Sequence, residues 1–172
     1  QEITDVSGSS AGALVASALA FNCPGKHVYN CAIMSGVRSR FTALRALAVF
    51  FKLRPSLFSS ERFVTRMRNL LSFSSDSHLP LTIAVTDTNL KQKCKNMCNS
   101  SASDVARIAM ASAAIPFVWQ PENVDPFGLC CDGSVAQHVF PNEKIQHILK
   151  HGSGRLVVVN CVPWPGFRPP SQ

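Results

Sequence analysis

The chain has 172 residues, of which 46% are hydrophobic and 16% are charged, and these fractions exclude an intrinsically disordered protein. This length allows one domain with a hydrophobic core and is short for two. No apolar run reaches the roughly 18 residues of a membrane-spanning helix, and no signal peptide is recognisable, so the expected location is intracellular, in the cytoplasm or peripherally on a membrane.

The formal net charge of +7 is concentrated in one region. Residues 38–68 hold eight basic residues against the single acid Glu61, whereas the nine basic and nine acidic residues elsewhere cancel. A local basic patch of this kind suggests an anionic surface nearby. The basic residues are Arg38, Arg40, Arg45, Lys52, Arg54, Arg62, Arg66 and Arg68.

The first motif in the chain is Gly8-Ser9-Ser10-Ala11-Gly12, which follows a short apolar segment and precedes an alanine-rich helical one. Strand, tight turn and helix form the context of a nucleophile elbow. Gly8 and Gly12 are expected to be glycine because a Cβ at either position would collide with backbone. The helix start directs its first amides, including that of Ala11, at the space above Ser10. Ser10 is therefore the candidate nucleophile.

The middle of the chain predicts helices and one buried strand. Apolar residues at three- and four-residue steps predict a helix over residues 38–53, and a second helix is expected to begin at Ser59 or Ser60. Residues 26–36 fit either a strand or a helix. The nearly continuous apolar and β-branched run 79–87 is typical of a strand in a parallel sheet covered on both faces.

The second half continues the alternation of helices and strands. Residues 89–99 and 120–126 are expected to be connections without regular structure. Ser101 followed by Asp104 predicts the start of a helix that must end before Pro116. Further along, the pattern predicts a strand over residues 127–131, a helix from Asn142 to Gly152, a strand over residues 156–162 and an extended or disordered proline-rich tail over residues 163–172. We therefore expect one domain over residues 1–162, a three-layer α/β/α fold with a mostly parallel sheet.

The seven cysteines include no CxxC pair, and no metal-ligand set, P-loop or dinucleotide fingerprint is present. We expect free thiols, with Cys130, Cys131 and Cys161 buried as small hydrophobic residues, and no metal or other cofactor.

A serine nucleophile requires a base, and Asp132 is the candidate. Ser10 and Asp132 each follow a predicted strand, and functional groups gather where parallel strands end at their carboxyl edge. Gly133 follows at once and permits a tight turn with close approach. The alternative is that Asp132 opens a turn and contacts only its own backbone.

Three segments together resemble the patatin-like phospholipase family: residues 8–14, residues 111–116 and Asp132-Gly133-Ser134, in that order. The resemblance extends from the elbow to about residue 141. It implies a dyad without histidine, in which Ser10 attacks an ester carbonyl, Asp132 takes its proton, and water cleaves the acyl-enzyme. The implied substrate is a phospholipid or acylglycerol, at a membrane or lipid-droplet surface. Ser112 and Pro116 lie in the segment that packs close to the catalytic strands and are candidate supports of the site.

Two departures from the family pattern stand out. Ser134 occupies a position where the family usually has glycine or alanine. The glycine-rich oxyanion loop of the family precedes the elbow strand, and nothing in the sequence matches it. Losing one oxyanion donor costs on the order of 100- to 1000-fold in rate. We therefore expect the fold to be incomplete at its N-terminus and the chain as given to be weakly active or inactive, whereas the full-length protein is expected to be a hydrolase.

Other functions stay open at this point. An α/β-hydrolase triad would take its histidine from His138, since His147 and His151 are spaced as on a solvent-facing helix. A catalytically inactive protein could instead bind membranes through its basic region, with Arg38, Arg40, Arg45, Lys52 and Arg54 as the contacts. Nucleic-acid binding is disfavoured because no recognition motif accompanies the charge.

Overall fold

The computed structural model describes residues 3–28, 30, 56–73, 79–136, 150 and 157. The helix expected over residues 38–53, the strand over 156–162 and the tail lie outside the described residues apart from Val157. The same holds for nearly all of the helix expected from Asn142 to Gly152, so these parts and the domain boundary stay predictions.

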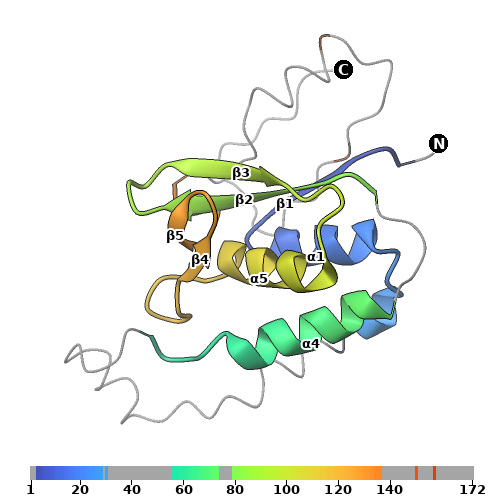
Figure 1. Cartoon of the computed structure of the whole chain (residues 1–172), viewed down its shortest axis with the longest axis horizontal. Coiled ribbons are helices and arrows are strands. Elements are labelled where there is room, and N and C mark those ends of the chain that lie inside the picture. The colour runs from blue at the N-terminus through green and yellow to red at the C-terminus, as the bar shows by residue number, and fades with distance from the viewer. Residues whose placement is uncertain are drawn as a thin grey trace.

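The described chain combines a five-stranded sheet with the helices α1, α4 and α5 and a helical segment at residues 25–28, and Figure 1 shows α1, α5 and α4 on the same side of that sheet. The predicted α/β class is therefore confirmed. Helices on the other side, which a three-layer arrangement needs, are absent from the part of the chain that the structure describes. In chain order the elements are β1 (Val6–Ser9), α1 (Ala11–Ala20), α4 (Glu61–Ser72), β2 (Leu81–Asp87), β3 (Gln92–Asn96), α5 (Ala102–Ser112), β4 (Glu122–Val124) and β5 (Gly128–Cys131).

The prediction of a mostly parallel sheet is wrong for the described strands. Only β1 and β2 pair in parallel, whereas β2–β3, β2–β5 and β4–β5 are antiparallel. Two segments that we expected to be irregular, residues 89–99 and 120–126, contain β3 and β4. Each forms a hairpin with a neighbour in the chain, and such short connections permit only antiparallel pairing.

Tight turns explain the first of these hairpins. The carboxylate of Asp87 accepts hydrogen bonds of 2.9 Å from the backbone N–H groups of Asn89 and Lys91, and Leu90 has a positive φ of 56°. An aspartate that bonds the backbone ahead of it is a turn former. The chain therefore reverses at Asp87 and returns as β3.

The pairing of β2 places two other strands end to end. β3 pairs with residues 82–86 and β1 with residues 81–84, so these strands lie on opposite edges of β2. β5 pairs with Thr86 and Asp87 of β2. At Thr86 one edge of β2 is already taken by β3, so β5 lies on the other edge, the same edge that β1 uses. Because β1 is parallel and β5 antiparallel to β2, the two run toward each other and end on either side of Val85.

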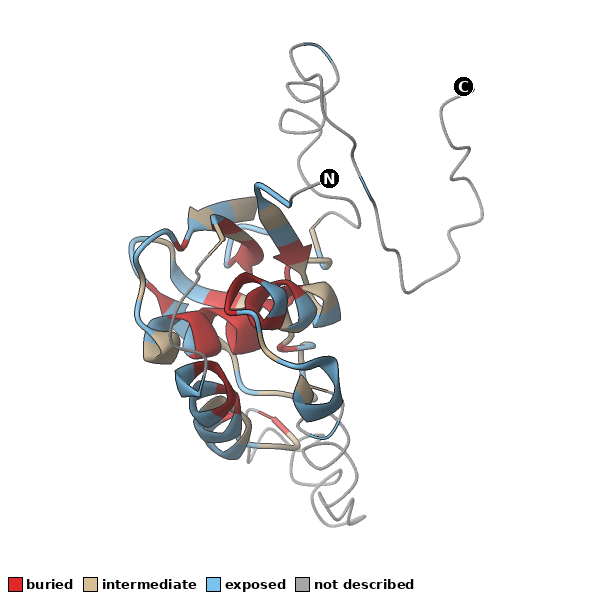
Figure 2. Cartoon of the chain, turned by 90° about the vertical axis from the view of Figure 1, so that its right-hand side faces the viewer, coloured by how far each residue is buried: buried red, intermediate tan, exposed pale blue. Residues whose placement is uncertain are grey.

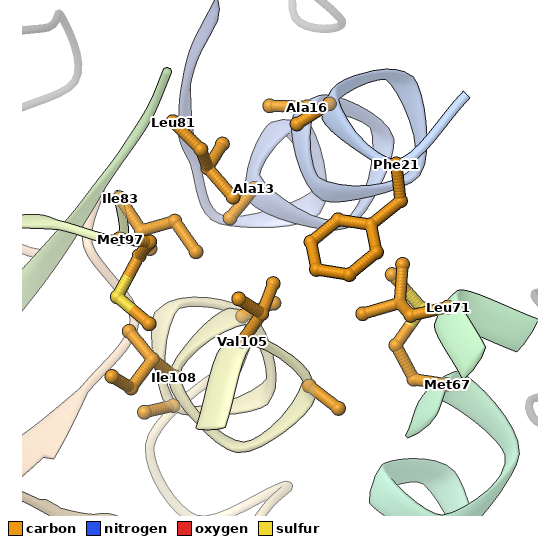
Figure 3. Packing of buried hydrophobic residues seen from close by; sticks show 14 of the residues in the cluster. Ala13, Ala16, Phe21, Met67, Leu71, Leu81, Ile83, Met97, Val105 and Ile108 are labelled. Atoms are coloured by element: carbon orange, nitrogen blue, oxygen red, sulfur yellow. The ribbon is translucent and has the colours of Figure 1, made fainter. Parts of the chain in front are cut away.

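The core lies where α1, α5 and α4 meet one another and the sheet. Figure 3 shows Phe21, at the end of α1, directed toward Leu71 and Met67 of α4, with Val105 of α5 beside it. Small buried residues on α1, such as Ala13, let this helix lie close to the strands. Figure 2 shows that the buried residues lie on the facing sides of these elements. Each large aliphatic side chain buried in this way contributes about 1.5–3 kcal/mol.

The two helix starts named by the sequence behave differently. Ser101 caps α5 as predicted, because its hydroxyl accepts a 3.1 Å hydrogen bond from the N–H of Asp104. Ser60 does stand at the N-cap position of α4, but its hydroxyl donates to the carboxylate of Glu122 and caps nothing. Ser60 therefore joins α4 to β4 across the fold.

The two neighbouring cysteines at the end of β5 differ in burial. Cys130 is buried, as predicted, whereas Cys131 is only half-buried, and burial raises the pKa of both thiols. Among the described residues, no helix is both long and apolar enough to cross a membrane.

Candidate functional site

Ser10 is the single residue between the end of β1 and the start of α1. Its backbone has φ 55° and ψ −133°, a conformation that residues other than glycine rarely adopt. Such strain costs about 1–3 kcal/mol and persists only where the surroundings enforce it. The sharp turn predicted for a nucleophile elbow is therefore present at Ser10.

The two glycines of the motif differ in their surroundings. A Cβ at Gly8 would lie 2.5 Å from the carbonyl oxygen of Gly12 and 2.6 Å from the Cα of Ala13, so no larger residue fits there. A Cβ at Gly12 would meet nothing within 4 Å. The expectation that Gly12 must be glycine to avoid a collision is wrong, because the first turn of α1 faces open space at this position.

The hydroxyl of Ser10 donates a 2.7 Å hydrogen bond to Oδ2 of Asp132. The other carboxylate oxygen, Oδ1, accepts a 2.8 Å hydrogen bond from the N–H of Ser134. Asp132 is only 4% exposed. The alternative in which Asp132 serves only its own turn is therefore incomplete: one oxygen holds the turn and the other faces Ser10.

The two side chains meet for a reason that differs from the predicted one. Ser10 follows β1 and Asp132 follows β5, but these strands are not parallel neighbours with a common carboxyl edge. They approach each other from opposite directions along β2, and their ends leave a gap at Val85. The serine enters this gap from one side and the aspartate from the other.

The backbone of Asp132 is fixed by hydrogen bonds from two other elements. Its N–H donates to the carbonyl of Ala114, just past α5, at 3.0 Å, and its carbonyl accepts from the hydroxyl of Thr86 in β2 at 2.8 Å. Thr86 is fully buried. Nothing in the sequence marks Thr86 as a site residue, since a threonine within a strand is a common strand former and carries no other signal.

Gly133 lies against β2. A Cβ at this position would overlap the carbonyl oxygen of Ala84 and would lie 2.7 Å from the hydroxyl of Ser9. The N–H of Gly133 donates to the carbonyl of Ser112 at 2.9 Å. The close approach expected of Gly133 is thus observed, and it holds Asp132 against the central strand.

Ser112, at the last position of α5, is fully buried beside the elbow. Its hydroxyl accepts a 2.9 Å hydrogen bond from the N–H of Ser10 and donates one of 2.5 Å to the carbonyl of Ala84. Pro116 is half-buried further along, and among the described residues no hydrogen bond joins it to Ser10 or Asp132.

The first amides of α1 belong to the residues that directly follow Ser10. The N–H of Ala13 donates to the carbonyl of Ser10, and the N–H of Ser10 itself is taken by Ser112. The amides of Ala11 and Gly12 have no acceptor among the described residues. No acidic residue stands in the first turn of α1, so this helix end is suited to negative charge.

Several predicted functional residues fall outside the described part of the chain. These are the proposed membrane contacts Arg38, Arg40, Arg45, Lys52 and Arg54 and the histidines His138, His147 and His151. Within the described part, no group of His, Cys, Asp and Glu side chains is arranged to hold a metal ion. What the structure brings together is a serine, a buried carboxylate and a helix N-terminus, an arrangement suited to acyl transfer.

A family model described as patatin-like phospholipase matches residues 2–141, which is most of the chain. No match was found among curated proteins.

Proposed function

Because the chain belongs to the patatin-like phospholipase family, whose members are lipid acyl hydrolases, we propose that it hydrolyses lipid esters through Ser10 and Asp132. The observation that carries this proposal is the 2.7 Å hydrogen bond from the Ser10 hydroxyl to the buried Asp132 carboxylate. The strained backbone of Ser10 supports it as well, because strain of this kind clusters at functional sites.

In the proposed reaction, Oγ of Ser10 attacks the ester carbonyl carbon while its proton passes to Oδ2 of Asp132. The tetrahedral intermediate places its negative oxygen near the amides of Ala11 and Gly12. It collapses when the leaving alkoxide takes the proton from Asp132, which leaves an acyl group on Ser10. Water then gives a proton to Asp132 and attacks the acyl carbon, and Ser10 recovers the proton as the fatty acid departs.

Turnover by this chain is proposed to be slow. The described residues offer only the first amides of α1 as donors to an oxyanion, whereas the family also uses a glycine-rich loop that nothing in this sequence matches. Each missing donor lowers the rate on the order of 100- to 1000-fold. Covalent labelling is a more sensitive readout than turnover, because one reaction per chain is detected and the label stays on the serine.

The test is reaction of the chain with a fluorophosphonate, followed by mass spectrometry to locate the label, and turnover of a p-nitrophenyl ester. We expect labelling at Ser10 and none in Ser10→Ala. Asp132→Asn should slow labelling about 100- to 10,000-fold through loss of the general base. The controls are Ser7→Ala and Asp125→Asn, both at exposed positions, and both should react like wild type. Labelling at any other serine would refute the assignment.

A peripheral membrane location is proposed from the surface of α4. This helix buries Met67, Leu70 and Leu71, while its exposed side carries arginines and ends near Phe73, which is 89% exposed. Basic side chains beside an exposed aromatic suit a surface of anionic lipid. The exposed arginines are Arg62, Arg66 and Arg68.

Sedimentation with vesicles tests this location. Vesicles with anionic lipid should bind the chain more tightly than neutral ones, and Arg62→Gln/Arg68→Gln should weaken that binding. Arg107→Gln, an exposed arginine on α5, is the matched control. Equal binding to both kinds of vesicle would contradict an electrostatic contact. Binding to anionic vesicles without any labelling of Ser10 would favour the alternative, a catalytically inactive membrane-binding protein.

A further inference from the structure

The nucleophile and the base follow different strands of the sheet, and one buried residue, through its side chain and its backbone, contacts the segments that carry both. Ser112 accepts from the N–H of Ser10 through its hydroxyl, at 2.9 Å, and accepts from the N–H of Gly133 through its carbonyl, at 2.9 Å. Its hydroxyl also donates to the carbonyl of Ala84 in β2. Ser112 thus connects the elbow, the central strand and the residue after the base.

We propose that Ser112 is a positioning residue that sets the distance between Ser10 and Asp132, a role that rests on the function proposed above. β1 and β5 are not hydrogen-bonded to each other, and both end at the gap opposite Val85. The register with β2 sets where the two strands end, but Ser10 and Asp132 each lie one residue beyond these ends, and no strand pairing joins those two residues. At this gap Ser112, the last residue of α5, makes hydrogen bonds to both Ser10 and Gly133.

The chemistry of a hydroxyl explains why serine stands here. One group must accept a hydrogen bond from the Ser10 amide and donate one to the Ala84 carbonyl, and a hydroxyl does both. Ser112 is fully buried, so water has no access to replace either bond. An alanine would leave the Ser10 N–H without its acceptor at the residue whose φ is 55°. Without that acceptor the strained backbone of Ser10 is free to relax, and the Ser10 side chain moves with it.

The contact also defines the role of the neighbouring amides. Because Ser112 occupies the N–H of Ser10, that amide is unavailable to a developing oxyanion, and the amides of Ala11 and Gly12 are left for it. Loss of the Ser112 hydroxyl would disturb both the hydrogen bond to Asp132 and the direction of these amides. A misplacement of about 1 Å at reacting atoms costs on the order of 100-fold in rate.

A matched pair of variants separates positioning from stability. Ser112→Ala removes a buried hydroxyl that accepts from the N–H of Ser10 and donates to the carbonyl of Ala84. Ser17→Ala removes another fully buried helical hydroxyl, which donates to the carbonyl of Ala13 at 2.7 Å and does not contact the dyad. Both variants should lower the melting temperature, Ser112→Ala the more, because its hydroxyl makes two hydrogen bonds and that of Ser17 makes one. Only Ser112→Ala should slow fluorophosphonate labelling of Ser10, by about 10- to 100-fold, and lower kcat more than it raises KM.

Hydrogen exchange of the Ser10 amide, followed by nuclear magnetic resonance, gives a readout that needs no activity. This amide should be protected in wild type and in Ser17→Ala and should exchange faster in Ser112→Ala. Retained protection in Ser112→Ala, or unchanged labelling once protection is lost, overturns the proposal. If Ser112→Ala does not fold, Ser112→Cys, which is somewhat larger than serine and accepts hydrogen bonds weakly, decides by the same two criteria. A wild-type chain that does not react at Ser10 refutes the proposed function instead, while the exchange data still test the contact.

Discussion

The Cα of Gly8 lies beneath the carbonyl group of Gly12, so close that a Cβ on Gly8 would lie 2.5 Å from that oxygen. We therefore predict that Gly8→Ala destabilises the chain by at least about 2 kcal/mol, because backbone atoms rather than a flexible side chain would have to move. Thermal unfolding followed by circular dichroism measures this.

Gly12→Ala is the matched control for that substitution. The position is open and helical, and alanine is the better helix former, so stability should stay equal or rise by about 0.5 kcal/mol. A similar loss of stability in both variants would contradict the difference between the two positions. The comparison concerns stability alone, since Gly12 lies next to the proposed oxyanion position.

The strained backbone of Ser10 predicts an unusual order of stability. Ser10→Gly and Ser10→Ala both remove the hydroxyl and should both abolish labelling by a fluorophosphonate. Glycine adopts a φ of 55° without strain, whereas alanine does not, so Ser10→Gly should be the more stable by about 1 kcal/mol. Urea unfolding of the two variants side by side tests this. Equal midpoints would show that the turn relaxes once the hydroxyl is gone.

The turn after β2 predicts a loss of stability in acid. The backbone N–H of Lys91 is the main cause that lowers the pKa of Asp87, and the N–H of Asn89 and the charge of Lys93 add to it. A carboxyl whose pKa is lowered by folding stabilises the fold above its unfolded value, about 3.9, and this contribution is lost as the pH falls through the lower folded value.

Asp87→Asn tests that contribution. The variant should be less stable than wild type at neutral pH, and its urea midpoint should change less than that of wild type between about pH 6 and pH 3. The amide of asparagine accepts the same hydrogen bonds without titrating, which isolates the charge. A midpoint that changes as much as that of wild type would place the acid sensitivity at other carboxylates.

The dyad predicts that histidine is dispensable. His138→Ala should label at Ser10 at a rate within about twofold of wild type, because Asp132 already holds the Ser10 hydroxyl at 2.7 Å. In a triad the same change would lower the rate by several orders of magnitude. Kinetics of fluorophosphonate labelling at neutral pH distinguish these outcomes, with His27→Ala, at an exposed position after α1, as the control.

The elements that the sequence predicted well are those with a local cause. The elbow turn, the helix capped by Ser101 and the buried strand that became β2 all follow from short patterns of residues. The strands β3 and β4 were missed because their lysine-, asparagine- and glutamate-containing segments lack apolar alternation. Such strands form because a neighbouring strand offers its backbone across a short turn, and that partner is not visible in a window of sequence.

The sequence by itself determined which groups this protein would use: a serine in a turn between a strand and a helix, a carboxylate before a glycine, and a short segment of small residues. Only the tertiary structure decided how they meet. β1 and β5 run head to head along β2, and Ser112 bridges the gap between their ends. The physical reason is that residue types fix local conformation and hydrogen-bonding capacity, whereas the direction of a strand depends on partners far away in the chain. Ser10 and Asp132 are more than a hundred positions apart in the chain, and their 2.7 Å hydrogen bond forms because those strand partners bring them together.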